Sequence, residues 1–321
     1  MDDRRPLLVL AGFLGSGKTT FLRALVQDAT GGSTAVVANE FGAVGLDDRI
    51  AGLVVDEPLA VVGGCVCCAK RSELVATLHR LLDLEARDLR PRAERIVVET
   101  SGLADPAPVV EAVVGDPMLR HQLRVAEVVV TVDAVNGWDQ LDTEDLAHRQ
   151  VVGADRLLIT KVDLVDPCRV GRLAARLTRL NPLVSPEPVR HGTVQPGPVP
   201  LGELEGDEKE APPAAPDDVV AVTVDLDPPV DWLAFSVWLS MLCHARGREV
   251  LRIKGLMDLG PGGPVAVNGV QGVIHEPEHL PELPAARSQL VAIVRPWLAD
   301  ALEPSLRAFL ALGSPEEAGA R

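Results

Sequence analysis

The sequence of 321 residues contains no tyrosine, and its total aromatic content is only 3%. A protein that stacks the bases of single-stranded nucleic acid needs an aromatic surface, so this composition argues against that mode of binding. Positive charge is also scarce, because 31 lysines and arginines stand against 46 aspartates and glutamates, giving a formal net charge of −15. We therefore expect no direct binding to nucleic acid and no electrostatic attraction to an anionic membrane.

Long apolar runs are missing as well. No stretch approaches the roughly 20 apolar residues of a membrane-spanning helix. A secretory signal would need an apolar segment with a small-residue cleavage site, and cleavage near Ala11 would destroy the motif that begins at Gly12. We expect a cytoplasmic protein. The hydrophobic content of 47% is ample for a packed core, and the length suits one large domain or two ordinary ones.

The most informative motif is Gly-Phe-Leu-Gly-Ser-Gly-Lys-Thr at residues 12–19, a complete G-x-x-x-x-G-K-[ST] phosphate-binding loop. The apolar run Leu7–Ala11 before it is typical of a buried strand, and an amphipathic helical pattern follows it. Backbone N–H groups of the loop and the helix N-terminus would bind nucleotide phosphates. The expected binding residues are Gly12, Gly15, Ser16, Gly17, Lys18, Thr19 and Thr20.

Two side chains of this loop and one carboxylate have predicted catalytic or metal-binding roles. Lys18 can reach the β- and γ-phosphates, and the Thr19 hydroxyl can bind Mg²⁺. The strand candidate Ile96–Val98 ends at Glu99, which can bind Mg²⁺ or organise the attacking water. Gly102 behind it would let a backbone N–H face the γ-phosphate. We expect Lys18 and Glu99 to be catalytic.

A second nucleotide motif, Thr160-Lys161-Val162-Asp163, follows the strand candidate Leu157–Ile159 and resembles the guanine-specificity motif of GTPases. The Asp163 carboxylate can accept hydrogen bonds from guanine N1–H and the exocyclic amine, whereas adenine has no donor at that ring nitrogen. Asp163 is therefore expected to select GTP over ATP, with Thr160 and Lys161 in the same loop. Thr160 stands where this motif usually has Asn. The replacement is expected to weaken the contact that braces the base-binding loop at residues 160–163 (the base loop) against the phosphate loop.

The segment Asn39-Glu40-Phe41-Gly42 follows the strand candidate Ala35–Ala38 directly. In this order of elements it occupies the region of a nucleotide-sensing switch loop. Glu40 is expected to face Mg²⁺ or a second metal; a solvated turn is the alternative.

Three of the five cysteines form the cluster Cys65-Val66-Cys67-Cys68. In a cytoplasmic protein such a cluster indicates metal or redox chemistry rather than a disulfide framework. The nearby Lys70 and Arg71, and the helical pattern that starts near Ser72, would stabilise the thiolate form. Thiolates bind Zn²⁺, Co²⁺ or Cu(I).

The expected cargo-metal ligands are Cys65, Cys67 and Cys68, completed by Glu40 or a histidine. Adjacent cysteines cannot both be ideal ligands of one ion, and no second cysteine pair exists, so a structural zinc site is disfavoured. A strained or incomplete set suits a protein that must release its metal. Inert buried cysteines and thiol redox chemistry between Cys65 and Cys68 remain as alternatives.

Strand and helix patterns alternate up to about residue 190. The strand candidates are Leu7–Ala11, Ala35–Ala38, Ile96–Val98, Val128–Val132 and Leu157–Ile159. This alternation predicts an α/β fold, a P-loop NTPase domain with a mostly parallel sheet, over residues 1–190. Residues 191–218 are rich in proline and acidic residues and indicate a linker, with an acidic metal-collecting segment as the alternative.

A second domain is expected over residues 219–321. Its predicted strands are Val219–Leu226, Glu249–Leu256, Val265–Ile274 and Leu290–Val294, and its predicted helices are Trp232–Cys243 and Trp297–Leu312. The order β-α-β-β-β-α is typical of a small α+β domain.

Taken together, the motifs resemble the CobW family of metal-associated P-loop GTPases. The resemblance rests on residues 12–20, 39–42, 63–68, 99–106 and 160–163, and on residues 252–255 and 270–273 of the second domain. It implies a GTPase that carries or inserts a transition metal, often zinc and in some branches cobalt or iron, with the cysteine motif as metal site. The chain lacks the histidine-rich stretch of many members, which argues against metal storage.

The sequence therefore predicts a Mg²⁺-dependent GTPase that couples GTP binding and hydrolysis to delivery of a transition metal, zinc above all, to a client protein. The C-terminal domain is expected to recognise that client. Two alternatives belong to other classes: a GTP-gated regulatory module without metal delivery, and a small-molecule kinase that uses the same phosphate loop.

Overall fold

The structure is a computed structural model that describes residues 3–27, 33–39, 59–61, 71–194, 219–261, 263–281 and 287–313. These residues form two compact units, which divide the chain between residues 215 and 216. Among the helices of the described residues, none has the length and apolar character needed to cross a membrane.

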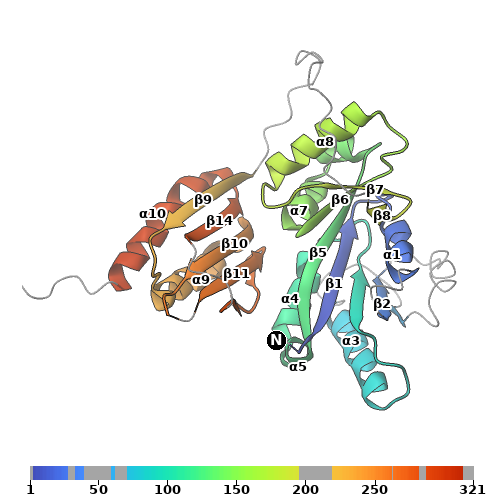
Figure 1. The fold of residues 1–321 in the computed structure, drawn as a ribbon, viewed down its shortest axis with the longest axis horizontal. Helices are drawn as coiled ribbons and strands as arrows, with labels where there is room; N and C mark the ends of the chain where they lie inside the picture. Colours follow the sequence, from blue (N-terminus) through green and yellow to red (C-terminus); the bar gives the residue numbers. More distant parts are fainter. Residues whose placement is uncertain are drawn as a thin grey trace, which may run out of the picture. The chain divides into compact units, whose positions relative to one another are not determined.

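The first unit is built on an eight-stranded sheet with the order β3-β2-β4-β1-β5-β6-β7-β8 (Figure 1). Its strands are β1 (Arg5–Gly12), β2 (Thr34–Asn39), β3 (Leu59–Val61), β4 (Arg95–Glu99), β5 (Leu123–Asp133), β6 (Arg156–Thr160), β7 (Glu187–Arg190) and β8 (Thr193–Val194). All neighbouring pairs are parallel except β7 with β8. The predicted α/β fold with a mostly parallel sheet is confirmed.

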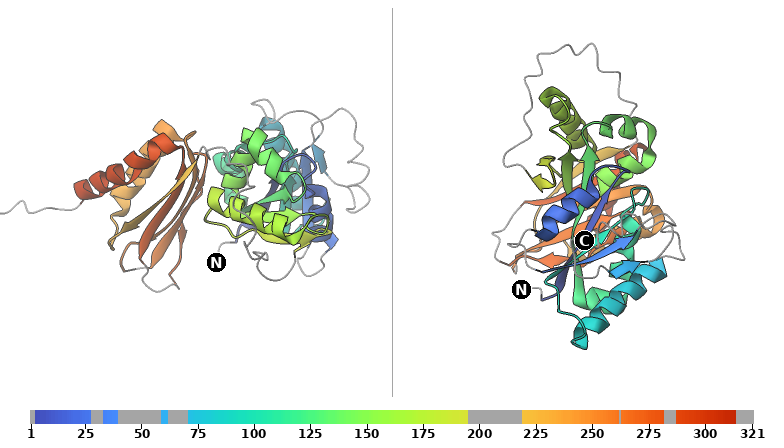
Figure 2. Two further views of the ribbon diagram at one scale, coloured as in Figure 1. Left: turned by 90° about the horizontal axis from the view of Figure 1, so that it is seen from above. Right: turned by 90° about the vertical axis from the view of Figure 1, so that its right-hand side faces the viewer.

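Helices cover both faces of this sheet, as Figure 2 shows from two further directions. The described helices are α1 (Lys18–Gln27), α3 (Arg71–Ala86), α4 (Ala107–Gly115), α5 (Pro117–Gln122), α6 (Gly137–Thr143), α7 (Asp145–Gly153) and α8 (Pro167–Leu180). Right-handed crossovers place α1 on one face and α3, α4, α7 and α8 on the other. Central strands are therefore buried on both faces, which explains why Leu7–Ala11 is an uninterrupted apolar run.

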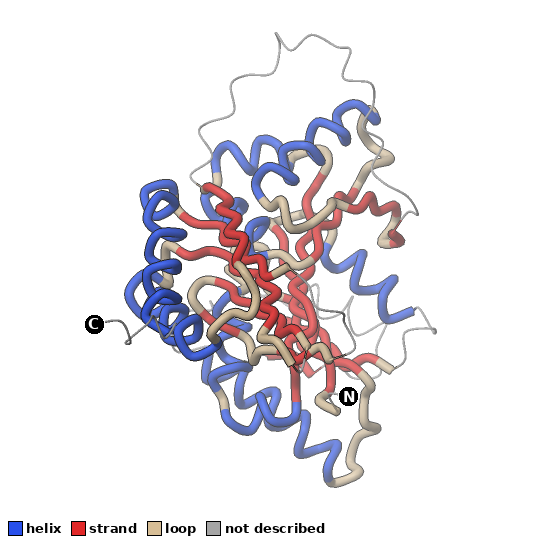
Figure 3. The backbone as a smooth tube through the Cα atoms, turned by 60° about the vertical axis from the view of Figure 1, so that its left-hand side comes forward, coloured by secondary structure: helices blue, strands red, loops and turns tan. Residues whose placement is uncertain are grey.

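The second unit is an antiparallel sheet with two helices against one of its faces (Figure 3). Its strands are β9 (Val220–Leu226), β10 (Val250–Asp258), β11 (Pro264–Val270), β12 (Val273–Ile274), β13 (Glu278–His279) and β14 (Ser288–Val294), and its helices are α9 (Trp232–Arg246) and α10 (Pro296–Gly313). The strands follow the order β12-β11-β10-β14-β9, and β13 pairs with β11. This arrangement confirms the predicted smaller α+β domain.

An aromatic cluster on α9 packs in the core of this second unit. Asp231 caps α9 by accepting hydrogen bonds from the backbone N–H groups of its first turn. The ring of Phe235 lies 5.8 Å from that of Trp232 and 6.0 Å from that of Trp238, measured between centroids. The Trp238 indole also donates a hydrogen bond of 3.1 Å to Ser305 on α10, which joins the two helices.

One predicted strand of the second unit was wrong. Val265–Ile274 is not one strand but a hairpin, with β11 and β12 joined by Gln271 and Gly272. Both turn residues have positive φ, 46° and 77°, as a type I′ hairpin turn requires. The turn falls where Gln271 and Gly272 separate Val270 from Val273, and Gly272 is a residue that permits a turn.

Candidate nucleotide-binding site

The candidate site lies at one edge of the parallel sheet, where neighbouring strands end. Gly12, Glu99, Asp133 and Thr160 are the last residues of β1, β4, β5 and β6, respectively. These four strands are adjacent and parallel, so their carboxyl ends meet. The topology therefore brings together the phosphate loop, the carboxylate Glu99 and the base-loop residue Thr160, which lie far apart in the sequence.

The phosphate loop is held tightly against β5. Gly12 has φ of 139°, and a Cβ atom there would lie 2.4 Å from the carbonyl oxygen of Thr131. The hydroxyls of Ser16 and Thr131 form a buried hydrogen bond of 2.7 Å across the same gap. A glycine at position 12 is therefore required by close packing as well as by its backbone conformation.

Lys18 begins α1, and its side chain turns back into the loop. The ammonium donates hydrogen bonds to the carbonyls of Gly12, at 2.9 Å, and Phe13, at 3.1 Å. Burial lowers the pKa of Lys18 below its ordinary value, an effect that the carboxylate of Glu99 partly offsets. The ammonium thus lies inside the loop, where negatively charged phosphates would stabilise its charged form.

The two predicted Mg²⁺ ligands are in direct contact. The Thr19 hydroxyl donates a hydrogen bond of 3.1 Å to Oε1 of Glu99. A hydroxyl and a carboxylate beside a phosphate-binding loop are the oxygen donors that Mg²⁺ accepts in proteins. The donor set of this chain therefore fits magnesium.

The loop behind Glu99 packs on the phosphate loop. A Cβ atom on Gly102 would lie 2.7 Å from Cδ2 and 2.8 Å from both Cα and N of Leu14. Only a residue without a side chain allows this approach of two backbones. Gly102 is thus brought next to the phosphate loop.

The base loop is braced to the phosphate loop by Thr160. Its hydroxyl lies 2.7 Å from the carbonyl oxygen of Ser16, to which it donates a buried hydrogen bond. This contact differs from the expectation that replacing Asn by Thr weakens the brace. The short threonine side chain suffices because the end of β6 lies beside the phosphate loop, where a Cβ on Gly17 would be 3.4 Å from Thr160.

Asp133 is a functional candidate that the sequence analysis missed. Its side chain, 1% exposed, accepts hydrogen bonds from the Lys161 ammonium at 2.7 Å, the Val135 N–H at 2.8 Å and the Asn136 amide at 2.9 Å. Burial alone would raise the pKa of the Asp133 carboxyl. The hydrogen bonds lower that pKa by more than burial raises it, so the pKa is below its ordinary value. The signal was present, since Asp133 ends an apolar strand as Glu99 does.

Asp133 thereby holds Lys161, which has a positive φ of 57°. Asp163 follows two residues later and is exposed at the surface of the same loop. Among the remaining predicted residues, Gly15 and Thr20 are also exposed at the phosphate loop.

The predicted cargo-metal ligands Glu40, Cys65, Cys67 and Cys68 lie outside the described residues. Within the part of the chain that the structure describes, no group of three or more His, Cys, Asp or Glu residues could hold a metal ion.

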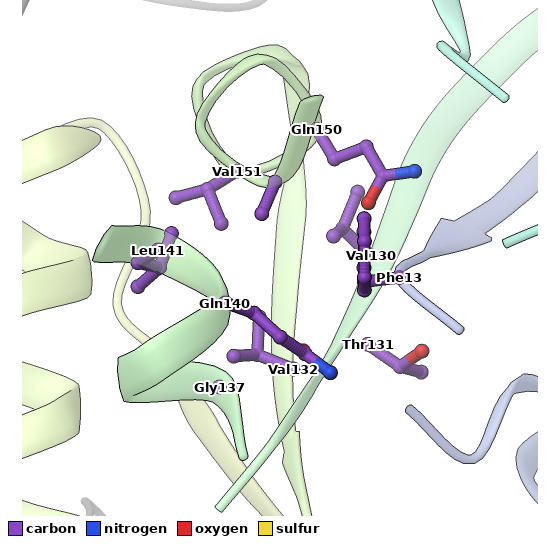
Figure 4. A pocket seen from close by; sticks show the side chains of 10 residues that line it. Phe13, Val130, Thr131, Val132, Gly137, Gln140, Leu141, Gln150 and Val151 are labelled. Atoms are coloured by element: carbon purple, nitrogen blue, oxygen red, sulfur yellow. The ribbon is translucent and has the colours of Figure 1, made fainter. Parts of the chain in front are cut away.

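A small cavity lies beside the phosphate loop, with a volume of about 10 Å³ (Figure 4). Phe13 of the loop, Gln140 of α6 and Gln150 of α7 line it together with residues of β5. This volume is at the lower limit of what one water molecule needs.

Comparison with known proteins decides the family. Residues 6–185 match the family described as "CobW/HypB/UreG, nucleotide-binding domain", and residues 219–310 match the "Cobalamin synthesis protein cobW C-terminal domain". The chain belongs to the CobW family. The two family domains correspond to the two compact units of the structure.

Curated relatives of this CobW family member match much of the chain. The chain is 32% identical to the zinc chaperone YjiA of Escherichia coli over 264 residues, 78% of this chain and 80% of that relative. It spans about half the length of other curated relatives that it matches.

Among solved structures, the crystal structure of Zn(II)-bound YjiA GTPase from E. coli has a TM-score of 0.67 and 25% identity. The match covers 95% of this chain and 99% of that one. A Zn(II)-bound YjiA triple mutant, in which one glutamate and two cysteines are replaced by alanine, matches with the same TM-score, identity and coverage. With its P-loop domain and these relatives, the CobW chain is a GTPase.

Proposed function

We propose that this chain uses GTP binding and hydrolysis to control the binding of a transition metal, foremost zinc, and its delivery to a client protein. The part of this proposal that concerns GTP is supported above all by the contact between the Thr19 hydroxyl and Glu99, beside the buried ammonium of Lys18. It assembles a hydroxyl, a carboxylate and a cation around one phosphate-binding loop. This is the charge arrangement that phosphoryl transfer needs.

Each residue then has a role in hydrolysis. Lys18 exchanges its hydrogen bonds to the loop carbonyls for the β- and γ-phosphates, and Gly102 presents a backbone N–H to the γ-phosphate. Glu99 orients the attacking water or holds Mg²⁺ together with Thr19. Bound there, Mg²⁺ supplies positive charge that neutralises the phosphate oxygens. Asp163 accepts hydrogen bonds from guanine, and Asp133 positions the base loop by holding Lys161.

The metal half rests on the cysteine cluster. Cys65, Cys67 and Cys68, completed by Glu40, provide thiolate and carboxylate donors for Zn²⁺ or Co²⁺. The relative named a zinc chaperone and the Zn(II)-bound YjiA structure support zinc as the metal. The domain at residues 219–310 would recognise the metal-accepting client, and we place this activity in the cytoplasm, without nucleic acid or a membrane.

Replacement of Cys65, Cys67 and Cys68 by serine tests the metal assignment. The triple variant should lose high-affinity zinc binding, because serine does not supply a thiolate, while its GTP affinity stays within about twofold. Affinity must be measured by competition with a chelator, because a YjiA variant that lacks one glutamate and two cysteines is still a Zn(II)-bound structure.

The matched control replaces Cys168 and Cys243, the two cysteines outside the cluster, by serine. It should bind zinc as the parent does. A triple-serine variant with the zinc affinity of the parent would refute the assignment of the cluster.

A further inference from the structure

The loop between β4 and α4 connects Glu99 to the rest of the fold. It starts with Thr100, whose N–H donates to the Leu10 carbonyl at 2.9 Å. It then passes Gly102, which packs on Leu14 of the phosphate loop. At its end Asp105 accepts a hydrogen bond of 3.0 Å from the Ala107 N–H, which starts α4. The position of this loop therefore decides where Glu99 and Gly102 lie relative to the terminal phosphate.

A glutamine on α7 holds the middle of this loop. Gln150 is 1% exposed, and its amide donates a buried hydrogen bond of 2.8 Å to the carbonyl of Ala104. The neighbouring Arg149 adds a hydrogen bond of 3.2 Å to the carboxylate of Asp105. Figure 4 shows Gln150 extending from α7 beside Phe13 of the phosphate loop. Gln150 thus contacts the loop that carries Gly102 without being part of any nucleotide motif.

The C-terminal end of α7, next to Gln150, is also fixed. The amide of Asn181, at the end of α8, donates hydrogen bonds of 2.9 Å to the Val151 carbonyl and 3.0 Å to the Ala154 carbonyl. Directly after α7, β6 leads to Thr160, which braces the phosphate loop. Because this end of α7 is held by hydrogen bonds, the backbone of Gln150 has a fixed position. Its side-chain amide therefore holds the Ala104 carbonyl at a defined place.

We propose that Gln150 is a positioning residue for GTP hydrolysis, which fixes the loop behind Glu99 through its hydrogen bond to Ala104. The residue is not catalytic, since its amide contacts the loop backbone and not the motif residues that bind nucleotide. Its loss would leave a buried carbonyl without this donor, and the loop would relax to satisfy it. Small displacements of groups around a reacting phosphate cost rate far more than they cost nucleotide affinity.

The Gln150→Met variant tests this role, because methionine has a similar length and no hydrogen-bond donor. The matched control is Gln140→Met, since Gln140 lines the same cavity from α6. We expect Gln150→Met to lower kcat for GTP roughly ten- to a hundredfold, with KM and GDP affinity within about twofold. The control should keep the kcat of the parent. Unchanged GDP affinity and thermal unfolding would show that both variants fold.

A second variant, Gln150→Glu, tests the hydrogen bond itself. A protonated carboxyl can donate to the Ala104 carbonyl and a carboxylate cannot, and burial raises the pKa of such a carboxyl. The kcat of this variant relative to the parent should therefore fall as pH rises. A ratio that rises with pH would contradict the proposal, as would a Gln150→Met variant with parental kcat or an equal loss in the control.

The proposal rests on GTP hydrolysis by this chain, and the two can fail separately. A parent protein that does not hydrolyse GTP would overturn the proposed function. Hydrolysis by the parent that is unaffected in Gln150→Met would overturn only the role of Gln150.

Discussion

Thr160 shows how one hydroxyl group connects the two halves of the nucleotide site. Its hydrogen bond to the Ser16 carbonyl joins the last residue of β6 to the phosphate loop. The hydroxyl and the acceptor are both buried, so nothing in the solvent replaces the bond if it is lost. We infer that phosphate and base binding support one another through this contact.

The Thr160→Val variant removes that contact, together with a longer one of 3.3 Å to the Val132 carbonyl, because valine keeps the shape of threonine and lacks the hydroxyl. An unsatisfied buried carbonyl costs about 1–3 kcal/mol, so GDP should bind at least about fivefold more weakly. Titration calorimetry with GDP measures the change. Thr160→Ser, which keeps the donor, should bind GDP as the parent does, and equal affinity of the valine variant would show that the brace contributes nothing.

The sequence indicated candidate site residues where their partners are close to them in the chain. The phosphate loop is a contiguous motif, and Glu99 and Asp163 follow apolar strands at defined positions. Asp133 carries the same signal, because it ends an apolar strand as Glu99 does, but its role is visible only in its hydrogen bond to Lys161, 28 residues away in the sequence. Gln150 was not predicted, because its role depends on Ala104, 46 residues away. A buried glutamine on an amphipathic helix has no sequence signal that distinguishes it from an exposed one.

Elements were predictable where the burial pattern is simple. The central parallel strands are apolar runs that end at a glycine or a polar residue, and the structure contains each of them. The hairpin of β11 and β12 escaped prediction although Gln271 and Gly272 interrupt the apolar residues, because an isolated glycine also occurs inside strands, and the positive φ of both residues is visible only in the structure. The chemistry of turns therefore carries information that apolar periodicity does not.

The turn at Gly272 should tolerate no side chain. Gly272 has φ of 77°, and a Cβ there would lie 2.6 Å from the Cα of Gly247. Gly260 offers a matched control with φ of 86°, where the nearest heavy atom to such a Cβ is 3.6 Å away. Both alanine variants carry the cost of the left-handed conformation, about 1–2 kcal/mol.

In Gly272→Ala the new side chain must also displace the backbone of Gly247. We expect it to lower the free energy of unfolding by at least about 1 kcal/mol more than Gly260→Ala does. Urea denaturation of both variants measures the difference. Equal losses would mean that the close approach of Gly247 and Gly272 is not part of the folded state in solution.

At the scale of the whole molecule, the central claim is that nucleotide state and metal binding are coupled. In chain order, Glu40 and the cysteine cluster lie between β2, which pairs with β4 of the nucleotide site, and α3. If the γ-phosphate orders the segment that carries Glu40, it also changes the metal-ligand set. Linkage then requires that GTP shift metal affinity by the same factor by which metal shifts GTP affinity.

The most direct test is the zinc affinity of the full chain with GDP and with a non-hydrolysable GTP analogue, each measured against a chelator. We predict tighter zinc binding with the GTP analogue, by a factor of roughly 5–150, and release after hydrolysis. The triple-serine variant should show no difference in zinc affinity between the two nucleotide states. That result would assign the nucleotide-dependent zinc binding to the cysteine cluster. Equal zinc affinities in the two nucleotide states would contradict nucleotide-controlled metal delivery, even if the chain binds both ligands.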